Sequence, residues 1–180
     1  MVRRADAPPL PHIEMAPRVP EVQAHRALLH ASTMVRADLC VRLHAVLPPE
    51  LVPLVAHAMA VPDASLHREA AARCLGFSRR TLHRRLVQAG WPAPRRFLSS
   101  LRLLIAAGLL DHGIPCLNRI AWHLSFSDGV ALAKALRGFS GVTVSHLRAH
   151  GALSQCLARL HASPDTGTNA AAPIRMPLAR

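Results

Sequence analysis

The stretch LGFSRRTLHRRLVQAG, residues 75–90, decides the fold that this sequence predicts. Ser78 is a candidate N-cap for a helix, because the run that follows it contains neither proline nor glycine. Gly90 is placed to end that helix. Leu82 and Leu86 recur at helical spacing and form a narrow apolar stripe. The stretch therefore predicts a short amphipathic helix that packs through this stripe.

The opposite side of this helix is basic. Arg80 and Arg84 lie away from the apolar stripe, and His83 lies beside them. A helix of this size fits the major groove of B-DNA, where arginine can donate two hydrogen bonds to guanine. We therefore predict that this side of the helix contacts bases.

Another helix precedes this one along the chain. Ser65 is a candidate N-cap, and Leu66, Ala70 and Cys74 follow at helical spacing before Gly76. Two helices joined by a short turn that contains glycine form a helix-turn-helix unit.

A long helix is predicted after Pro92, with Pro94 in its first turn and its end near Gly113. Its apolar face is broad and consists of Phe97, Leu101, Leu104, Ile105 and Leu109. A helix with so wide an apolar face is largely buried, so we expect it to be a stiff linker.

The segment after the linker repeats the first unit. LNRIAWHLSFS, residues 117–127, has the hydrophobic period of residues 66–78, which indicates a duplicated helix-turn-helix. Ser127 or Asp128 is placed to cap its second helix, and Thr143 is placed to begin a last one.

The predicted fold class is all-α, with two helix-turn-helix units joined by a long linker helix and a short helical N-terminal extension. We expect four segments along the chain. These are a disordered arm (1–20), a short helical segment (21–62), the double helix-turn-helix domain (63–151) and a mostly disordered tail (152–180). Residues 21–62 contain one or two short helices and then a helix over Glu50–Ala60, and could be the stub of a shortened sensor domain.

Positive charge is concentrated in the double unit. The whole chain has a formal net charge of +12. Residues 63–151 account for +9 of this charge. Within that range, residues 66–102 contain nine arginines and one acidic residue, whereas residues 103–151 have a net charge of only +2. A local basic cluster is typical of a nucleic-acid interface. Composition alone leaves a membrane surface open as the other partner.

These motifs resemble the DNA-binding domain of AraC/XylS-type transcription regulators. The matching stretches are, in order, LGFSRRTLHRRLVQAG, RLLIAAGLL, IAWHLSFSD and LRGFSGVTVSHLRAHG, and together they span about half of the chain. The resemblance implies that two recognition helices enter successive segments of the major groove on one face of the duplex, with the linker helix holding them apart.

The resemblance also assigns DNA-binding residues by position. In the first unit they are Arg79, Arg80, Thr81, His83 and Arg84, and in the second they are Ser127, Asp128, Gly129, Val130 and Lys134. The family usually has glycine at the position of Ser125, and this sequence also departs from the family at Leu136, Val144 and Leu147. We therefore expect most base contacts from the first unit, and from the second unit packing and one phosphate contact through Lys134.

Enzymatic and metal-binding functions find little support. The twelve histidines are scattered, and no nucleophile elbow, carboxylate pair or phosphate-binding glycine loop occurs. The four cysteines (Cys40, Cys74, Cys116 and Cys156) lie too far apart along the chain for a zinc motif or a disulfide framework. We interpret them as small buried side chains, and we predict no enzyme activity, no cofactor and no metal.

The expected partner is double-stranded DNA, and RNA polymerase or another regulator is a further candidate. We expect no membrane association, a monomer or weak dimer, and a place in the bacterial cytoplasm on the nucleoid, because the first residues lack the apolar run of a signal peptide. The alternative is a degenerate paralogue whose helical domain binds another protein. The weak second recognition helix is the main support for that alternative.

Overall fold

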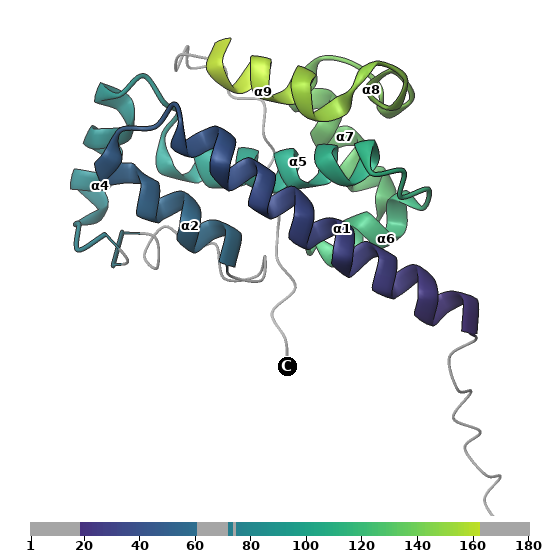
Figure 1. Ribbon diagram of the computed structural model, residues 1–180. Helices are drawn as coiled ribbons and strands as arrows, with labels where there is room; N and C mark the ends of the chain where they lie inside the picture. The colour runs from purple at the N-terminus through teal and green to yellow at the C-terminus, as the bar shows by residue number, and fades with distance from the viewer. Residues whose placement is uncertain (1–18, 61–71, 74, 163–180) are drawn as a thin grey trace, which may run out of the picture.

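The computed structural model describes residues 19–60, 72–73 and 75–162, and no strand occurs among them, which confirms the predicted all-α class (Figure 1). The elements are α1 (Val19–His44), the 3-10 helix η1 (Pro49–Leu51), α2 (Val52–Ala60), α4 (Arg79–Gln88), α5 (Pro94–Asp111), α6 (Leu117–His123), α7 (Gly129–Ser140), α8 (Val144–His150) and α9 (Ala152–Ala162). The predicted cap at Ser65, most of the helix after it, and the outer parts of the predicted arm and tail lie outside the described residues.

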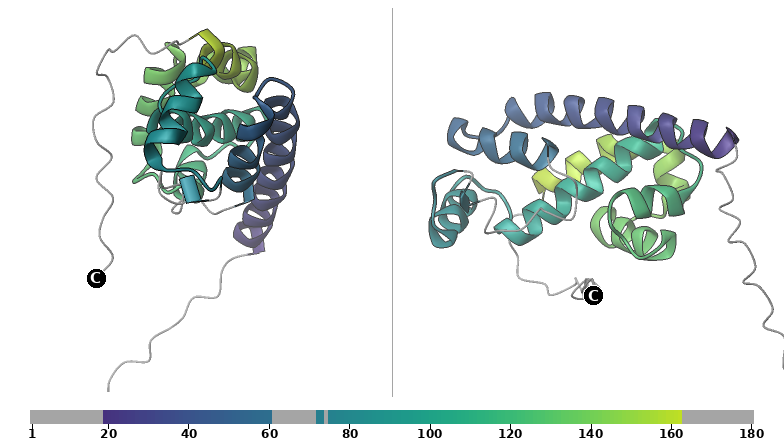
Figure 2. Two further views of the ribbon diagram at one scale, coloured as in Figure 1. Left: turned by 90° about the vertical axis from the view of Figure 1, so that its left-hand side faces the viewer. Right: turned by 90° about the horizontal axis from the view of Figure 1, so that it is seen from below.

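Helix α5 forms the centre of the core. The five apolar residues predicted to be buried in it have no exposed surface, namely Phe97, Leu101, Leu104, Ile105 and Leu109. Its other side is buried as well, because α1 packs along one flank and α9 along another (Figures 1 and 2). The linker is therefore enclosed on more sides than its sequence pattern indicated.

Helix α1 is one continuous helix that runs along α5. Leu28, Val35 and Leu39 are buried at helical spacing, so a single face of α1 meets the core. The two helices approach most closely at Gly108, where a built Cβ atom would lie 2.5 Å from a Val35 Cγ atom. A side chain at Gly108 would hold the helices apart.

Two predictions about the chain ends need correction. The predicted arm ended at residue 20 and one or two short helices followed it, whereas α1 begins at Val19 and extends without a break to His44. The segment from residue 152 was predicted to be mostly disordered, but its first eleven residues form α9. Both helices are stabilised by burial against α5, a partner that a local sequence pattern does not reveal.

The N-terminus of α9 is capped by a residue far away in the sequence. The Asp111 carboxylate, at the end of α5, accepts hydrogen bonds from the amides of Ala152 (2.7 Å) and Leu153 (2.9 Å). Cys156, on the buried side of α9, has no exposed surface. Burial, and then the nearby Asp111 charge, raise the pKa of the Cys156 thiol to about 12.

The other described cysteines differ from the expectation of burial. Cys40 is half-buried and Cys116 is exposed. Within the described residues, no group of three or more His, Cys, Asp or Glu side chains could hold a metal ion. In that same part of the chain, no helix is both long and apolar enough to cross a membrane.

Candidate nucleic-acid interface

Helix α4 has the predicted cap and the predicted buried stripe. The Ser78 Oγ atom accepts a hydrogen bond from the Thr81 amide at 3.1 Å, and Leu82 and Leu86 are buried. Arg80, His83 and Arg84 are exposed on the side away from the core. With Val87, one helical turn further on, these residues are called here the outer face of α4.

The turns that lead into the two recognition helices have the same backbone hydrogen bonds. In the first, the Phe77 amide donates to the Ala72 carbonyl at 2.9 Å, and in the second the Phe126 amide donates to the Ala121 carbonyl at 2.8 Å. The residue before each phenylalanine is left-handed, with φ of 64° at Gly76 and 56° at Ser125. The predicted duplication is therefore present in the backbone.

The register between the units changes by one residue after the turn. Gly76 and Ser125 are 49 positions apart, but the N-caps Ser78 and Asp128 are 50 apart. The buried leucines keep this new spacing, Leu82 with Leu132 and Leu86 with Leu136. The outer face of α4 therefore corresponds to an outer face of α7 made of Val130 for Arg80, Ala133 for His83, Lys134 for Arg84 and Arg137 for Val87.

Helix α7 presents only some of the predicted residues outward. Val130 and Lys134 are exposed, and so is Arg137, which the sequence analysis did not single out. Gly129 is buried, and its amide donates to the Asn118 side-chain oxygen at 2.6 Å. Asp128 is the N-cap, and its carboxylate accepts from the Ala131 amide at 2.7 Å.

Part of the predicted DNA-binding set is engaged in contacts within the protein, while its contacts with DNA stay a prediction. Gly129 is buried where α7 packs against α6, and it has no side chain with which to meet a base. Asp128 uses one carboxylate oxygen for the helix cap, and the Ser127 hydroxyl donates to the other carboxylate oxygen at 3.4 Å. In the first unit, the Thr81 hydroxyl lies 2.9 Å from that of Ser78 and belongs to the cap of α4.

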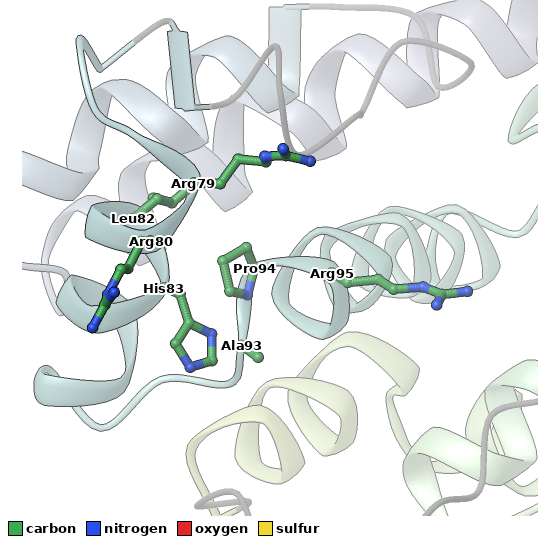
Figure 3. A pocket seen from close by; sticks show the side chains of 7 residues that line it. All are labelled: Arg79, Arg80, Leu82, His83, Ala93, Pro94 and Arg95. Atoms are coloured by element: carbon green, nitrogen blue, oxygen red, sulfur yellow. The ribbon is translucent and has the colours of Figure 1, made fainter.

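A shallow pocket of about 490 Å³ lies between α4 and the start of α5. Figure 3 shows that the charged side chains around it diverge: Arg80 extends from one side of α4, whereas Arg79 and Arg95 extend in the other direction. The Arg79 side chain therefore points away from that of Arg80. These guanidinium groups do not converge on one point, so they do not form a binding site for a small anion. Their spread along the surface suits contacts with an extended polyanion.

Helix α5 fixes the turn of the second unit through Arg102. Its guanidinium group donates to the carbonyl oxygens of Leu124 and Ser125, and it lies 5.0 Å from the centre of the Phe126 ring. Carbonyls that cannot pair within a helix are costly when left without a donor. Arg102 therefore holds the end of α6 and the turn on the linker.

The N-terminal helices (α1, η1 and α2) contact both units. Glu50 forms a salt bridge of 3.2 Å with Arg85 of α4. At the other end, the Ser32 hydroxyl lies 2.8 Å from the His123 Nε2 atom of α6. In the right-hand view of Figure 2, α1 lies along one edge of the molecule, with α4 near one end of α5 and the second unit near the other.

Two outer-face residues of α7 were missed by the sequence analysis, namely Ala133 and Arg137. The signal for both was in the sequence, because the leucine pairs at a spacing of 50 align α4 with α7 residue by residue. The sequence analysis aligned the helices that precede the turns and did not carry an alignment through α7.

In a comparison with known protein families, residues 71–150 match a family model described as a helix-turn-helix domain. The HTH-type transcriptional activator RhaS of Escherichia coli O157:H7 is 43% identical over 60 residues, 33% of this chain and 22% of that protein. The activator of the same name from Salmonella arizonae is 42% identical over 60 residues. The chain thus spans 22% of the length of these curated relatives. No solved structure matches it.

Proposed function

Because residues 71–150 form an AraC-type helix-turn-helix domain, we propose that this protein binds double-stranded DNA sequence-specifically and regulates transcription. The observation that carries the proposal is the outer face of α4. It exposes Arg80, His83 and Arg84 on a helix that is capped at its start and packed on a buried linker. Such a helix can enter the major groove and donate hydrogen bonds to guanine.

In this proposal the two units have unequal roles. Arg80 and Arg84 supply most of the hydrogen bonds to bases, whereas Lys134 meets a phosphate. Phosphate contacts position a protein on the duplex, and base contacts specify the sequence. The N-terminal helices keep the spacing of the two units, supported by their contacts with Arg85 and His123. The protein acts on the bacterial nucleoid, as a monomer or weak dimer, through RNA polymerase or another regulator.

Selection of bound duplexes from a random pool tests the proposal directly. We expect one enriched sequence, and binding to it should weaken with salt. If about five phosphates are contacted, the logarithm of the association constant should fall against the logarithm of salt concentration with a slope of about −4 to −5. A chain that enriches no sequence and shows no salt dependence would instead support a protein-interaction module.

Three variants separate base contacts from general charge. Arg84→Ala should cost about 1–3 kcal/mol of binding free energy and relax the preference at one base pair. Lys134→Ala should weaken all duplexes alike and less. Arg26→Ala is the matched control, because Arg26 is an exposed arginine on α1 and belongs to neither recognition helix. Equal effects of Arg84→Ala and Arg26→Ala on the enriched sequence would contradict the role given to α4.

A further inference from the structure

The outer face of α7 carries a valine where the outer face of α4 carries an arginine. Val130 is 79% exposed, the highest value among the large apolar side chains of the described residues. A single exposed valine is common on protein surfaces. What distinguishes Val130 is its register, because the spacing of 50 places it at the position of Arg80, in the first turn of a recognition helix.

The surroundings of Val130 combine an apolar hollow with nearby positive charge. A shallow hollow of about 370 Å³ beside it is lined by Cys116, Leu117, Asn118, Gly129, Val130 and Ala133. The exposed cations Lys134 and Arg137 follow on the same face of α7. The core of a protein–protein interface is depleted in charge. A small apolar site next to two cations matches instead the edge of a base that lies between phosphates.

We infer that Val130, with Ala133 beside it, contacts the C5-methyl group of a thymine in the part of the DNA site that α7 occupies. This inference rests on the proposed function. Thymine presents a methyl group in the major groove, and an apolar side chain can distinguish it from cytosine by that group. The two units then recognise bases by different chemistry, α4 through hydrogen bonds from arginine and α7 through apolar contact. Lys134 and Arg137 contact the flanking phosphates.

Replacement of thymine by deoxyuridine tests the inference, because it removes only the methyl group. The half of the selected site that belongs to α7 is the half whose base preferences survive Arg84→Ala. Each thymine of that half is replaced in turn, and affinity for the full chain is measured. At one position we expect binding to weaken about four-fold, since burying one such carbon group contributes about 0.8 kcal/mol.

Two protein variants make this test specific. Val130→Ala should abolish the penalty for deoxyuridine at that position, because the shortened side chain no longer reaches the methyl group. Val41→Ala is the matched control, since Val41 is 71% exposed on α1, and it should leave the penalty intact. Both side chains are exposed, so we expect the two variants to have equal melting temperatures. That result would exclude a folding defect.

The outcomes also separate this inference from the proposed function. A selected site without thymine in the half that belongs to α7, or with thymines that tolerate deoxyuridine, overturns the thymine contact and leaves sequence-specific binding intact. A penalty that persists unchanged in Val130→Ala shows that another group contacts the methyl. A chain that binds no duplex overturns both.

Discussion

The two turns have the same backbone, yet their surroundings differ. Gly76 and Ser125 occupy equivalent left-handed positions, and the next amide closes each turn on an equivalent alanine carbonyl. The second turn is in addition held by Arg102 of the linker helix. The first unit is joined to the N-terminal helices through the half-exposed pair of Glu50 and Arg85. The two turns thus share their backbone hydrogen bonds but differ in the side chains from other helices that contact them.

The outward surfaces have diverged even more than the supports. The α4 face combines two arginines with a histidine, and the corresponding α7 positions combine a valine and an alanine with Lys134 and Arg137. Buried leucines at matching positions show that the core side was constrained by packing. The outer side is largely exposed, so packing within the protein does not fix its residues.

The largest effect is expected where the two units share one core. Leu104 is fully buried in α5, so Leu104→Ala should lower the free energy of unfolding by about 2–5 kcal/mol. Because α5 packs against elements of both units, we expect one cooperative transition by circular dichroism and a loss of DNA binding with it. Leu29→Ala, at a half-exposed leucine of α1, is the control and should change stability by less than about 0.5 kcal/mol. Two separate transitions would contradict a shared core.

Removal of the Arg102 donor should affect the second unit alone. Arg102→Met keeps an aliphatic side chain in place but leaves the Leu124 and Ser125 carbonyls without this partner, at a cost of about 1.5–3 kcal/mol. Hydrogen exchange of the Phe126 amide should become faster, while that of Phe77 stays unchanged. Equal acceleration at both amides would mean that Arg102 acts through the common core.

A pair of glycine variants tests the contact of α1 with the linker. Gly108→Ala introduces a Cβ atom where Val35 already lies, so we expect a loss of about 1–3 kcal/mol in denaturant unfolding. Gly138→Ala is the matched control on α7, where a built Cβ atom has no neighbour within 4 Å, and it should stabilise by about 0.5–1 kcal/mol. Adding Val35→Ala should recover part of the first loss. Two variants with the same effect would show that α1 does not approach α5 at Gly108.

Local signals predicted much of this fold. The cap at Ser78 is confirmed, and of the two candidates Ser127 and Asp128 it is Asp128 that caps α7. Thr143, which was predicted to begin the last helix, is the N-cap of α8. These signals are local, because a capping side chain acts on an amide three residues away. The burial of the linker leucines is confirmed as well. In contrast, α9 was missed because its cap comes from Asp111, and the continuity of α1 was missed because its buried face needs α5. The buried residues of α1 do recur at helical spacing, but that pattern does not show which distant segment they pack against.

The candidate site was predictable to a similar degree. Arg80, His83 and Arg84 lie together on α4 because helical periodicity alone sets their direction relative to Leu82. Gly129 was predicted to contact DNA, but it is buried beside Asn118 of the preceding helix, a contact that the helical pattern of α7 does not show. Which of the exposed residues touch DNA stays a prediction.

The smallest expected effect compares the two turns themselves. An L-residue with a side chain pays about 1–2 kcal/mol in the left-handed region, and glycine does not. Ser125→Gly should therefore stabilise the chain, less the entropy that glycine adds to the unfolded state, about 0.4–1 kcal/mol. The net gain should be about 0.5–1 kcal/mol in denaturant unfolding. Gly76→Ser should destabilise by a similar amount, because its φ of 64° is close to the 56° of Ser125.

The double variant tests whether the two turns are energetically equivalent. If they are, exchanging the residues (Gly76→Ser with Ser125→Gly) should restore the stability of the parent chain, because the sites are far apart along the sequence and share no hydrogen bond in the described residues. A net loss would mean that the second turn tolerates serine better than the first. Arg102 would then be the physical reason, since it holds the Ser125 carbonyl and supports that conformation whichever residue occupies it. Repeating the exchange in Arg102→Met should in that case remove the difference between the turns.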